Sequence, residues 1–379
     1  MSDTMSRVTL ARRPKGAPVP EDFKLETGTL PTPATDEVLI EVTHLSLDPY
    51  MRGRMDDVKS YAPSVELGGT MTGQGVGRVL ESKAEGFAKD DTVTGMTGWA
   101  SHACLPGSEL RKLDPSLPPS TALGVLGMPG LTGWVGLHSF GKPKAGETLV
   151  VGAATGPVGS MVGQLAKELG LRTIAIAGGA EKCRLATETF GFDAAIDHRA
   201  HDDAASLRAA IAEAAPGGVD IYWENVAGKV LEAVMPLMNV HGRIPVCGMI
   251  AWYGGSNIAE TNQLPGMWRS ILVKRLHVSG FIIFDHWDEF PAFLADVAPK
   301  VAKGEIAYLE DVAEGLENAP NAFIAMLKGG NTGKQIVKLY ISTSTSNARR
   351  PARAPPLAST FIILNGFYHH TLPTHFNPH

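Results

Sequence analysis

Cysteine is scarce in this chain of 379 residues, and an excess of one charge is missing. Its three cysteines, Cys104, Cys183 and Cys247, are odd in number and far apart. They therefore predict no disulfide framework and favour a reducing compartment. The 34 basic and 39 acidic residues give a formal net charge of −5. That balance excludes the dense basic face that binding to nucleic acid or to a membrane surface requires.

Long apolar runs are missing as well. Residues 1–8 contain none, so we expect no signal peptide. Two long windows without charge, 115–141 and 148–166, are broken by prolines and glycines, whereas a bilayer span needs about 20 continuously apolar residues. Because 44% of the chain is nonetheless hydrophobic, we interpret both windows as protein core and expect a cytoplasmic protein.

Two patterns divide the chain. Residues 5–115 contain short alternating segments punctuated by glycine and proline, which is typical of a small β-barrel or sandwich. From about residue 120, strand-like segments alternate with helix-like ones, which predicts a parallel, doubly wound sheet. The segment 335–339 reads as one more strand, for which we expect no parallel partner nearby in the sequence.

Residues 341–379 differ from the rest of the chain. They contain no Asp or Glu, and their prolines preclude a regular helix over most of the segment. This composition is typical of a disordered extension. An apolar patch at 361–364 and the pair His369-His370 leave docking or metal binding open as alternatives.

A glycine-rich turn, GAATGPVG, runs from Gly152 to Gly159 between a buried strand and a helix. Binding a dinucleotide pyrophosphate needs a tight turn, backbone without a Cβ in the way, and free N–H groups at a helix N-terminus. Gly152, Gly156 and Gly159 meet these needs. Ala154 stands where the usual fingerprint has its second glycine, so a purely structural turn remains an alternative.

The type of dinucleotide is indicated one strand later. Folds that bind NAD place an acidic residue about 20 residues after the turn, where it holds the ribose 2′-hydroxyl. Here the strand ends in Gly178-Gly179, and Lys182 and Arg184 follow. Small residues leave room for a 2′-phosphate and the cations neutralise it, so NADP(H) is favoured over NAD(H). Glu181 argues the other way unless it points to solvent.

The metal-binding residue types are scattered. A catalytic zinc needs three ligands from Cys, His and carboxylates, and a structural zinc usually needs four. Three distant cysteines cannot form a four-thiolate site, and we interpret His44 and His102 as surface or core histidines. The sequence therefore predicts no metal. Without a metal to polarise an alcohol, an enzyme that transfers hydride must act on a group that is already electrophilic.

At this level of detail the chain resembles a known family. It is similar to the medium-chain dehydrogenase/reductase superfamily, and within it to the zinc-independent, NADPH-dependent alkenal/one double-bond reductases, the group of prostaglandin and curcumin reductases. The segments that carry the resemblance follow in family order over about residues 6–340: LDPYMRGRM (47–55), GMPGLTGW (127–134), GAATGPVGSMVGQLAK (152–167), ENVAGK (224–229), CGMIAWY (247–253), GFII (280–283) and NTGKQIVKL (331–339).

The resemblance implies an α/β fold in which a Rossmann doubly wound parallel sheet is joined to a GroES-like β-rich domain. We expect the GroES-like domain over residues 1–125, completed by about 305–340, and the Rossmann domain over 126–304. The extension would occupy 341–379. Completion of the first domain by the C-terminal segment would explain the strand at 335–339, and the family suggests a homodimer.

The resemblance also implies the residues that contact NADPH. Many family members have a tyrosine near the adenosine phosphate where this chain has His198, so that contact departs from the pattern. The expected cofactor residues are Thr132, Gly152, Ala153, Ala154, Thr155, Gly156, Pro157, Val158, Gly159, Gly179, Lys182, His198, Asn225, Cys247, Gly248, Met249, Ile250, Phe281, Ile282 and Asn331.

The expected activity is NADPH-dependent reduction of the C=C bond of α,β-unsaturated ketones and aldehydes, without a metal. Hydride goes to the β-carbon, and the carbonyl oxygen then needs a hydrogen-bond donor. Tyr253 is the first candidate, and Tyr50 is expected to line the substrate pocket with Met51 and Arg52. A quinone oxidoreductase on the same fold and a non-catalytic NADPH-binding scaffold remain the alternatives.

Overall fold

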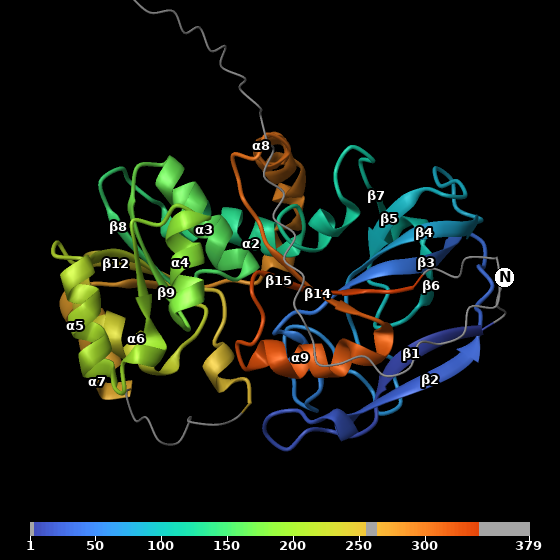
Figure 1. Cartoon of the computed structure of the whole chain (residues 1–379), viewed down its shortest axis with the longest axis horizontal. Coiled ribbons are helices and arrows are strands. Elements are labelled where there is room, and N and C mark those ends of the chain that lie inside the picture. The colour runs from blue at the N-terminus through green and yellow to red at the C-terminus, as the bar shows by residue number, and fades with distance from the viewer. Residues whose placement is uncertain (1–3, 255–263, 341–379) are drawn as a thin grey trace, which may run out of the picture.

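The computed structural model describes residues 4–254 and 264–340. Figure 1 shows two halves side by side, each built on its own sheet. Within the described residues, no helix is long and apolar enough to cross a bilayer.

The first half is a six-stranded sheet in which all pairings are parallel. Strand order reverses direction between its two central strands, which is the point where parallel sheets bind ligands at the carboxyl ends of their strands. In spatial order the strands are β10 (Ala194–Asp197), β9 (Arg172–Ala177), β8 (Thr148–Gly152), β11 (Val219–Trp223), β12 (Met238–Val246) and β13 (His277–Gly280).

Helices cover both faces of this sheet because successive strand residues point to opposite sides. Leu149 and Val151 of β8 enter one core cluster, and Val150 between them enters another. The first cluster also takes side chains from α2 (Met128–Val135), α3 (Pro157–Glu168), α4 (Ala180–Glu188) and α8 (Phe290–Ala302). The second takes side chains from α5 (Ala204–Ala214), α6 (Gly228–Val234) and α7 (Leu264–Lys274).

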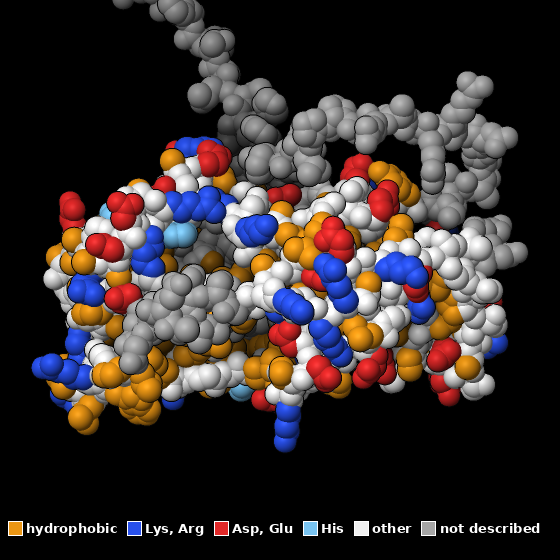
Figure 2. Space-filling model, turned by 90° about the horizontal axis from the view of Figure 1, so that it is seen from below, with side chains coloured by type: hydrophobic (Ala, Val, Ile, Leu, Met, Phe, Trp, Pro, Cys, Tyr) orange, Lys and Arg blue, Asp and Glu red, His pale blue; other side chains and the backbone are white. Residues whose placement is uncertain are grey.

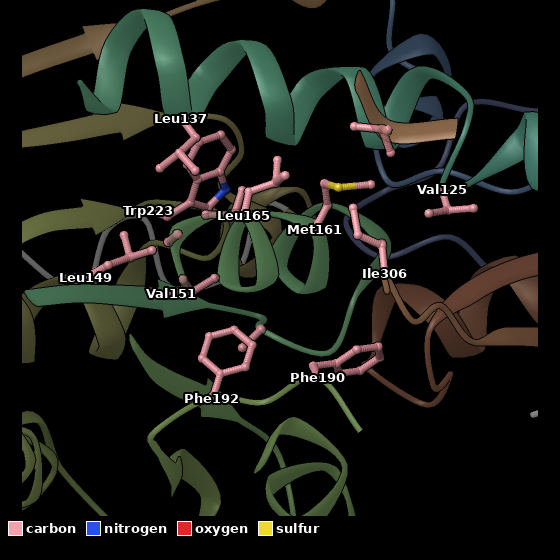
Figure 3. Close-up of a cluster of buried hydrophobic side chains, with 14 of the residues drawn as sticks. Val125, Leu137, Leu149, Val151, Met161, Leu165, Phe190, Phe192, Trp223 and Ile306 are labelled. Atoms are coloured by element: carbon pink, nitrogen blue, oxygen red, sulfur yellow. The ribbon is translucent and has the colours of Figure 1, made fainter. Parts of the chain in front are cut away.

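Figure 3 shows part of the first cluster between the sheet and the helix layer. Trp223 at the end of β11 is fully buried there, and Met161 and Leu165 of α3 lie between it and Ile306. Each fully buried large side chain contributes about 1.5–3 kcal/mol to the free energy of folding. This cluster therefore fixes the height of α3, and with it the glycine turn, over the sheet.

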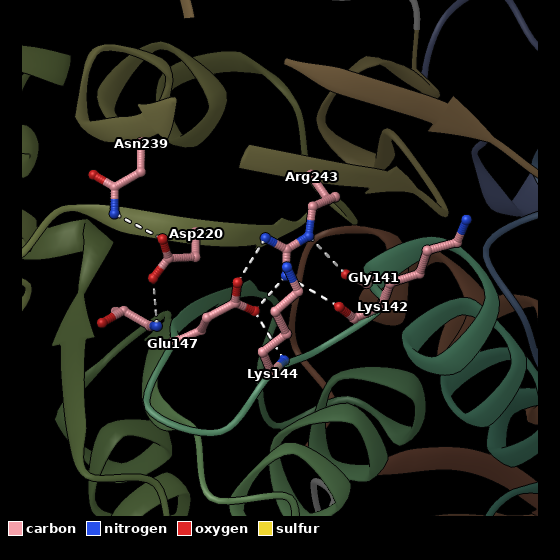
Figure 4. Close-up of polar contacts among 8 residues, drawn as sticks. Gly141, Lys142, Lys144, Glu147, Asp220, Asn239 and Arg243 are labelled. Atoms are coloured by element: carbon pink, nitrogen blue, oxygen red, sulfur yellow. Dashed lines mark hydrogen bonds and ion pairs between the residues drawn. The ribbon is translucent and has the colours of Figure 1, made fainter. Parts of the chain in front are cut away.

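Polar contacts join the strands of this sheet at their amino ends (Figure 4). Arg243 of β12 donates to the carbonyl oxygen of Gly141 at 2.9 Å and pairs with both carboxylate oxygens of Glu147. Asp220 of β11 accepts from the backbone N–H of Thr148 and from the side chain of Asn239, both at 2.8 Å. These contacts tie the amino end of the sheet and leave its carboxyl end for a site.

The second half is a seven-stranded sheet beside a two-stranded one. Its centre is β3 (Glu37–Ser46), which pairs with strands from both ends of the chain. The other strands are β14 (Glu310–Glu314), β15 (Lys334–Lys338), β4 (Gly75–Ser82), β5 (Thr92–Gly95), β7 (Arg111–Lys112) and β6 (His102–Pro106), with β1 (Thr4–Leu10) and β2 (Phe23–Thr29) as the separate pair.

Aromatic side chains form the core of this half. The rings of Phe23 and Trp99 stack at 5.6 Å, and Phe323 meets Trp99 edge-on at 5.5 Å. Phe323 lies on α9 (Ala319–Leu327), so the C-terminal segment is packed into the N-terminal half. The short helix α1 (Met51–Arg54) follows β3 in the sequence.

The structure confirms the predicted fold class and corrects one detail. The strand expected at 335–339 is β15, and it pairs in parallel with β14, which ends at Glu314. The expectation that it has no parallel partner nearby was wrong, because β14 (EDVAE) is short and largely charged and gave no apolar signal. The predicted domain boundaries at 125, 304 and 340 remain a proposal. The predicted extension, 341–379, lies outside the described residues.

Candidate functional site

A cavity of about 430 Å³ lies between the two halves, at the carboxyl ends of the central parallel strands. Both halves supply its walls. The half built on the parallel sheet, called the Rossmann half below, gives the glycine turn, the ends of β9, β11 and β12, and residues 281–284. The β-rich half gives residues 47–50, Tyr61 and the segment that runs from the end of α9 into β15. Apolar groups dominate its surface, and a few polar and charged side chains stand among them, as in most small-molecule sites.

The glycine turn presents backbone to this cavity. Ala153 has a positive φ of 51°, and the turn carries the chain from β8 into α3. A Cβ at Gly159 would lie 2.5 Å from the Ala153 carbonyl oxygen, so only glycine allows this close approach. Ala154 is fully buried in the core and points away from the cavity. The alanine that breaks the fingerprint therefore does not obstruct a ligand at the helix N-terminus.

Three basic side chains line the same end of the cavity: Lys182, His198 and Arg199. The Lys182 ammonium donates to the carbonyl oxygen of Gly329 at 2.9 Å, across from the other half. Within the described residues, none of the three forms an ion pair with a carboxylate. Burial, reinforced by the neighbouring charge of Arg199, lowers the pKa of Lys182. Burial and the neighbouring cations lower the pKa of His198, so this side chain is a neutral hydrogen-bonding group at pH 7. Lys182 and Arg199 favour an anion between them.

Two charged residues near Lys182, namely Glu181 and Arg184, do not line the cavity. Glu181 and Arg184 pair with each other at 2.7 Å on the exposed face of α4. Glu181, the residue that argued for NAD, therefore does not face the cavity. The wall itself contains Gly178, where a Cβ would lie 2.9 Å from Nε of Arg199 and 3.0 Å from Nε2 of His198. Glycine at this position lets both side chains fold over the strand end.

Hydroxyl groups mark the other end of the cavity. The phenol oxygen of Tyr253 accepts from the backbone N–H of Met249 at 3.3 Å, and no described residue accepts its hydrogen. Burial raises the pKa of Tyr253, and burial together with the charge of Asp48 raises that of Tyr50. Both phenols are thus protonated donors at neutral pH.

A buried carboxyl group, that of Glu224, holds the loop between β11 and α6 in place. Glu224 accepts from the backbone N–H groups of Val226 and Ala227 at 2.6 and 2.7 Å and from the Tyr222 hydroxyl at 3.0 Å. Burial raises the pKa of Glu224 to about 7. These bonds fix the loop that presents Asn225 to the cavity, and the Asn225 amide in turn donates to the Gly152 carbonyl at 2.8 Å.

A buried ion pair beside the phenols was not anticipated from the sequence. The Lys334 ammonium lies 2.7 Å from a carboxylate oxygen of Asp48 and donates to the Leu47 carbonyl oxygen at 2.7 Å. The other carboxylate oxygen of Asp48 accepts from the hydroxyl of Ser46. Lys334 directly precedes the strand expected at 335–339, and no local pattern marks it as buried. A buried ammonium requires an anion, and Asp48 supplies it.

The structure brings most of the expected residues to one cavity. Tyr50 and Tyr253 line it, and so do the expected cofactor residues Thr132, Ala153, Thr155, Gly156, Pro157, Val158, Gly159, Lys182, His198, Asn225, Cys247, Gly248, Ile250, Phe281, Ile282 and Asn331. Residues that reach it but were missed include Tyr61, Lys334 and Phe284.

A few expected residues lie elsewhere. Gly152, Ala154, Gly179 and Met249 are not part of the cavity wall. Met51 is fully buried in the core of the β-rich half. Arg52 points away from the cavity, where it donates to the Gly16 carbonyl oxygen at 2.8 Å and pairs with Asp56 at 2.7 Å. Both side chains therefore support the wall from behind.

Fold and cavity together define a class of protein, the two-domain dinucleotide-dependent oxidoreductases. Two family profiles match the chain: one described as the N-terminal domain of oxidoreductase over residues 6–113, and one described as zinc-binding dehydrogenase over residues 157–298. The chain belongs to the zinc-independent medium-chain dehydrogenase/reductase family. Among the described residues, no group of three or more His, Cys, Asp or Glu is placed to hold a metal ion.

Relatives within the family are close. An NADPH-dependent curcumin reductase of Escherichia coli (strain K12) is 48% identical over 88% of this chain and 96% of its own. A 2-alkenal reductase (NADP(+)-dependent) of Nicotiana tabacum is 41% identical over 87% of this chain and 96% of its own. The crystal structure of CurA in complex with NADPH from Vibrio vulnificus superposes with a TM-score of 0.84, at 46% identity over 89% of this chain and 99% of that one.

Proposed function

We propose that the protein reduces the C=C bond of α,β-unsaturated ketones and aldehydes with NADPH. One observation carries the proposal: a single cavity joins an open glycine turn and a group of unpaired cations to a phenol with a free hydrogen. Relatives described as curcumin, 2-alkenal, (+)-pulegone and prostaglandin reductases support the reaction, because all are named for such unsaturated substrates or for their NADPH dependence.

The residues present fit NADPH. The turn at 153–156 and the N-terminus of α3 offer backbone N–H groups to a pyrophosphate. Lys182 and Arg199, with no carboxylate partner in the described part of the chain, suit the doubly negative 2′-phosphate, and His198 adds a further donor. Gly178 and Gly179 follow β9 and leave room for a 2′-phosphate. The nearby carboxylate of Asp197, at the end of β10, accepts from the backbone N–H groups of Gly179 and Arg199 at 2.7 and 2.9 Å.

NADPH, when bound, supplies the hydride that adds to the β-carbon of the enone. Tyr253 donates its free hydrogen to the carbonyl oxygen, where negative charge collects in the transition state. The Met249 N–H, which donates to the phenol oxygen, makes that hydrogen a better donor. Tyr50 and the apolar wall hold the substrate and exclude water.

The activity is tested with a panel of enones and alkenals, each assayed with NADPH and with NADH, and with a quinone as the competing substrate class. We expect oxidation of NADPH with conversion of the C=C bond, and kcat/KM for enones well above that for the quinone. A higher kcat/KM for the quinone would assign the protein to the quinone oxidoreductases instead. Cofactor binding without turnover of any substrate would indicate a scaffold.

The role of Tyr253 is tested by Tyr253→Phe, which keeps the ring and removes the donor. Loss of one such donor costs about 10²–10³-fold in kcat where nothing substitutes for it. A cofactor ribose hydroxyl can substitute in part, so we expect a fall of about tenfold in kcat and little change in KM. Tyr50→Phe is the matched comparison and should act mainly on KM. The opposite pattern would reverse the two roles.

Cofactor choice is tested by Lys182→Glu. A charge-assisted hydrogen bond contributes about 1.5–3 kcal/mol, so KM for NADPH should rise about 10- to 100-fold while KM for NADH stays nearly constant. Arg184→Met is the control, because Arg184 pairs with Glu181 and Glu188 on the exposed face of the same helix. Equal effects of Lys182→Glu on both cofactors would show that its bond to Gly329 is structural, and would move the phosphate contact to Arg199.

We further propose a cytoplasmic homodimer. The reducing compartment is supported by the scarcity of cysteine. Dimerisation is supported by β13, an edge strand, and by the exposed apolar side chains of the neighbouring helix α7. Trp268 is 63% exposed and Leu272 77%. Figure 2 shows hydrophobic side chains gathered at this end of the molecule. Edge strands and apolar patches of this kind mark self-complementary interfaces.

The mass in solution, measured by light scattering after gel filtration, checks this surface. We expect twice the chain mass for the wild type and the mass of one chain for the double variant Trp268→Asp/Leu272→Asp. Leu67→Asp, at an exposed leucine of the β-rich half, is the control and should leave the mass unchanged. A wild-type monomer would contradict the proposal.

A further inference from the structure

One aromatic ring of the cavity has no role in the mechanism above. Tyr61 lines the cavity from the segment after α1, on the side of the β-rich half. Its ring is about half exposed, at 53%, so it forms part of the rim. Burial raises the pKa of Tyr61. Cys247 and Tyr253, from the half with the parallel sheet, line the same cavity. Tyr61 therefore shares this cavity with the proposed donor.

Arg54 connects Tyr61 to Tyr50. The centre of its guanidinium lies 4.6 Å from the ring centre of Tyr61 and 5.7 Å from that of Tyr50. Arg54 is only 7% exposed. It forms no ion pair with a carboxylate in the described part of the chain, and its guanidinium donates to the carbonyl oxygen of Pro63 at 3.4 Å. A desolvated cation over two ring faces is held by their quadrupoles, and so in turn fixes both rings.

The neighbouring arginine shows that this arrangement is specific to Arg54. Arg52 lies two residues earlier on the same short helix, points away from the cavity and is neutralised by Asp56 at 2.7 Å. Of these two arginines, therefore, one is satisfied by a carboxylate and a carbonyl, and the other mainly by the faces of two tyrosines that line the cavity. The charge of Arg54 is thus buried against two aromatic rings and the carbonyl oxygen of Pro63.

We propose that Tyr61 is a specificity-determining residue and that Arg54 is a positioning residue which holds the rings of Tyr61 and Tyr50 as one aromatic wall. This inference rests on the proposed function. Aromatic side chains at the rim favour an enone that carries a planar ring on the carbon atom receiving hydride, because such a ring can stack on a tyrosine over a large area. An enone with only a methyl group there has no such contact and depends little on Tyr61.

The test uses two substrates that differ only in this substituent, 4-phenyl-3-buten-2-one and 3-penten-2-one. For Tyr61→Leu we expect KM for the phenyl enone to rise about five- to tenfold, with KM for the methyl enone changed less than twofold and both kcat values nearly constant. Tyr61→Phe, which keeps the ring, should retain the wild-type ratio of the two KM values. Tyr340→Leu, at an exposed tyrosine outside the cavity, is the control.

The role of Arg54 is tested with the same ratio, that of KM for the phenyl enone to KM for the methyl enone. Arg54→Met removes the charge at similar length and should shift the ratio in the same direction as Tyr61→Leu, and Arg54→Lys should restore part of it because the cation returns. The double variant Arg54→Met/Tyr61→Leu should shift the ratio by less than the product of the two single effects, because Arg54 acts in part through Tyr61. If Arg54→Met does not fold, the half-exposed Tyr61 variants and Arg54→Lys still decide.

The outcomes separate the two proposals. A wild type that reduces both enones, with a ratio that Tyr61→Leu leaves unchanged, overturns this inference and leaves the proposed function standing. An equal rise in KM for both enones also overturns it, because that would make Tyr61 a general wall residue. A wild type that reduces neither enone overturns the proposed function, and this inference falls with it.

Discussion

A single buried ion pair holds together segments from opposite ends of the chain, and the site depends on it. Lys334 and Asp48 are 2% and 5% exposed, and their charged groups lie 2.7 Å apart. Burying both charges is costly, and the geometry compensates only because Leu47 and Ser46 satisfy the remaining hydrogen-bonding positions. Removing one partner of such a pair costs about 3–5 kcal/mol. The pair therefore keeps β15 beside β3, and this pairing carries the end of the chain back to the cavity wall.

The two ends of the cavity differ in charge, and that difference determines which ligand binds at which end. Lys182 and Arg199 leave positive charge at one end, where a phosphate replaces the solvation that burial has removed. At the other end the phenols of Tyr253 and Tyr50 are neutral, and burial raises their pKa values further, while Asp48 and Lys334 balance each other's charge. An anionic dinucleotide and a neutral carbonyl compound are thus sorted by electrostatics before any specific contact forms. The position of the glycine turn between the two ends follows from the packing of α3 on the sheet.

Much of this arrangement could be predicted from the sequence, because it depends on local patterns. Alternating strands and helices gave the parallel sheet, and the turn from Gly152 to Gly159 gave its ligand-binding edge. The direction in which each side chain points was harder to predict from the sequence. Tyr50 and Met51 are adjacent, yet one lines the cavity and the other is fully buried in the core, since α1 is a single short turn of helix whose orientation is set by packing. The partner of Lys334 lies 286 residues away, and no local pattern reveals a contact at that separation.

The burial that keeps the phenol of Tyr253 protonated also keeps a cysteine in the cavity from reacting with the substrate. An enone is an electrophile at its β-carbon, and a thiolate in the cavity would add there in competition with hydride. Cys247 lines the cavity beside Tyr253, but burial raises the pKa of its thiol to about 12. At pH 7 such a thiol stays protonated and is a poor nucleophile. A more solvated cavity would lower the pKa values of Cys247 and Tyr253 together, and would weaken the phenol as a donor at high pH while exposing a nucleophile. The apolar wall is therefore a chemical requirement of the proposed reaction as well as a means of binding its substrate.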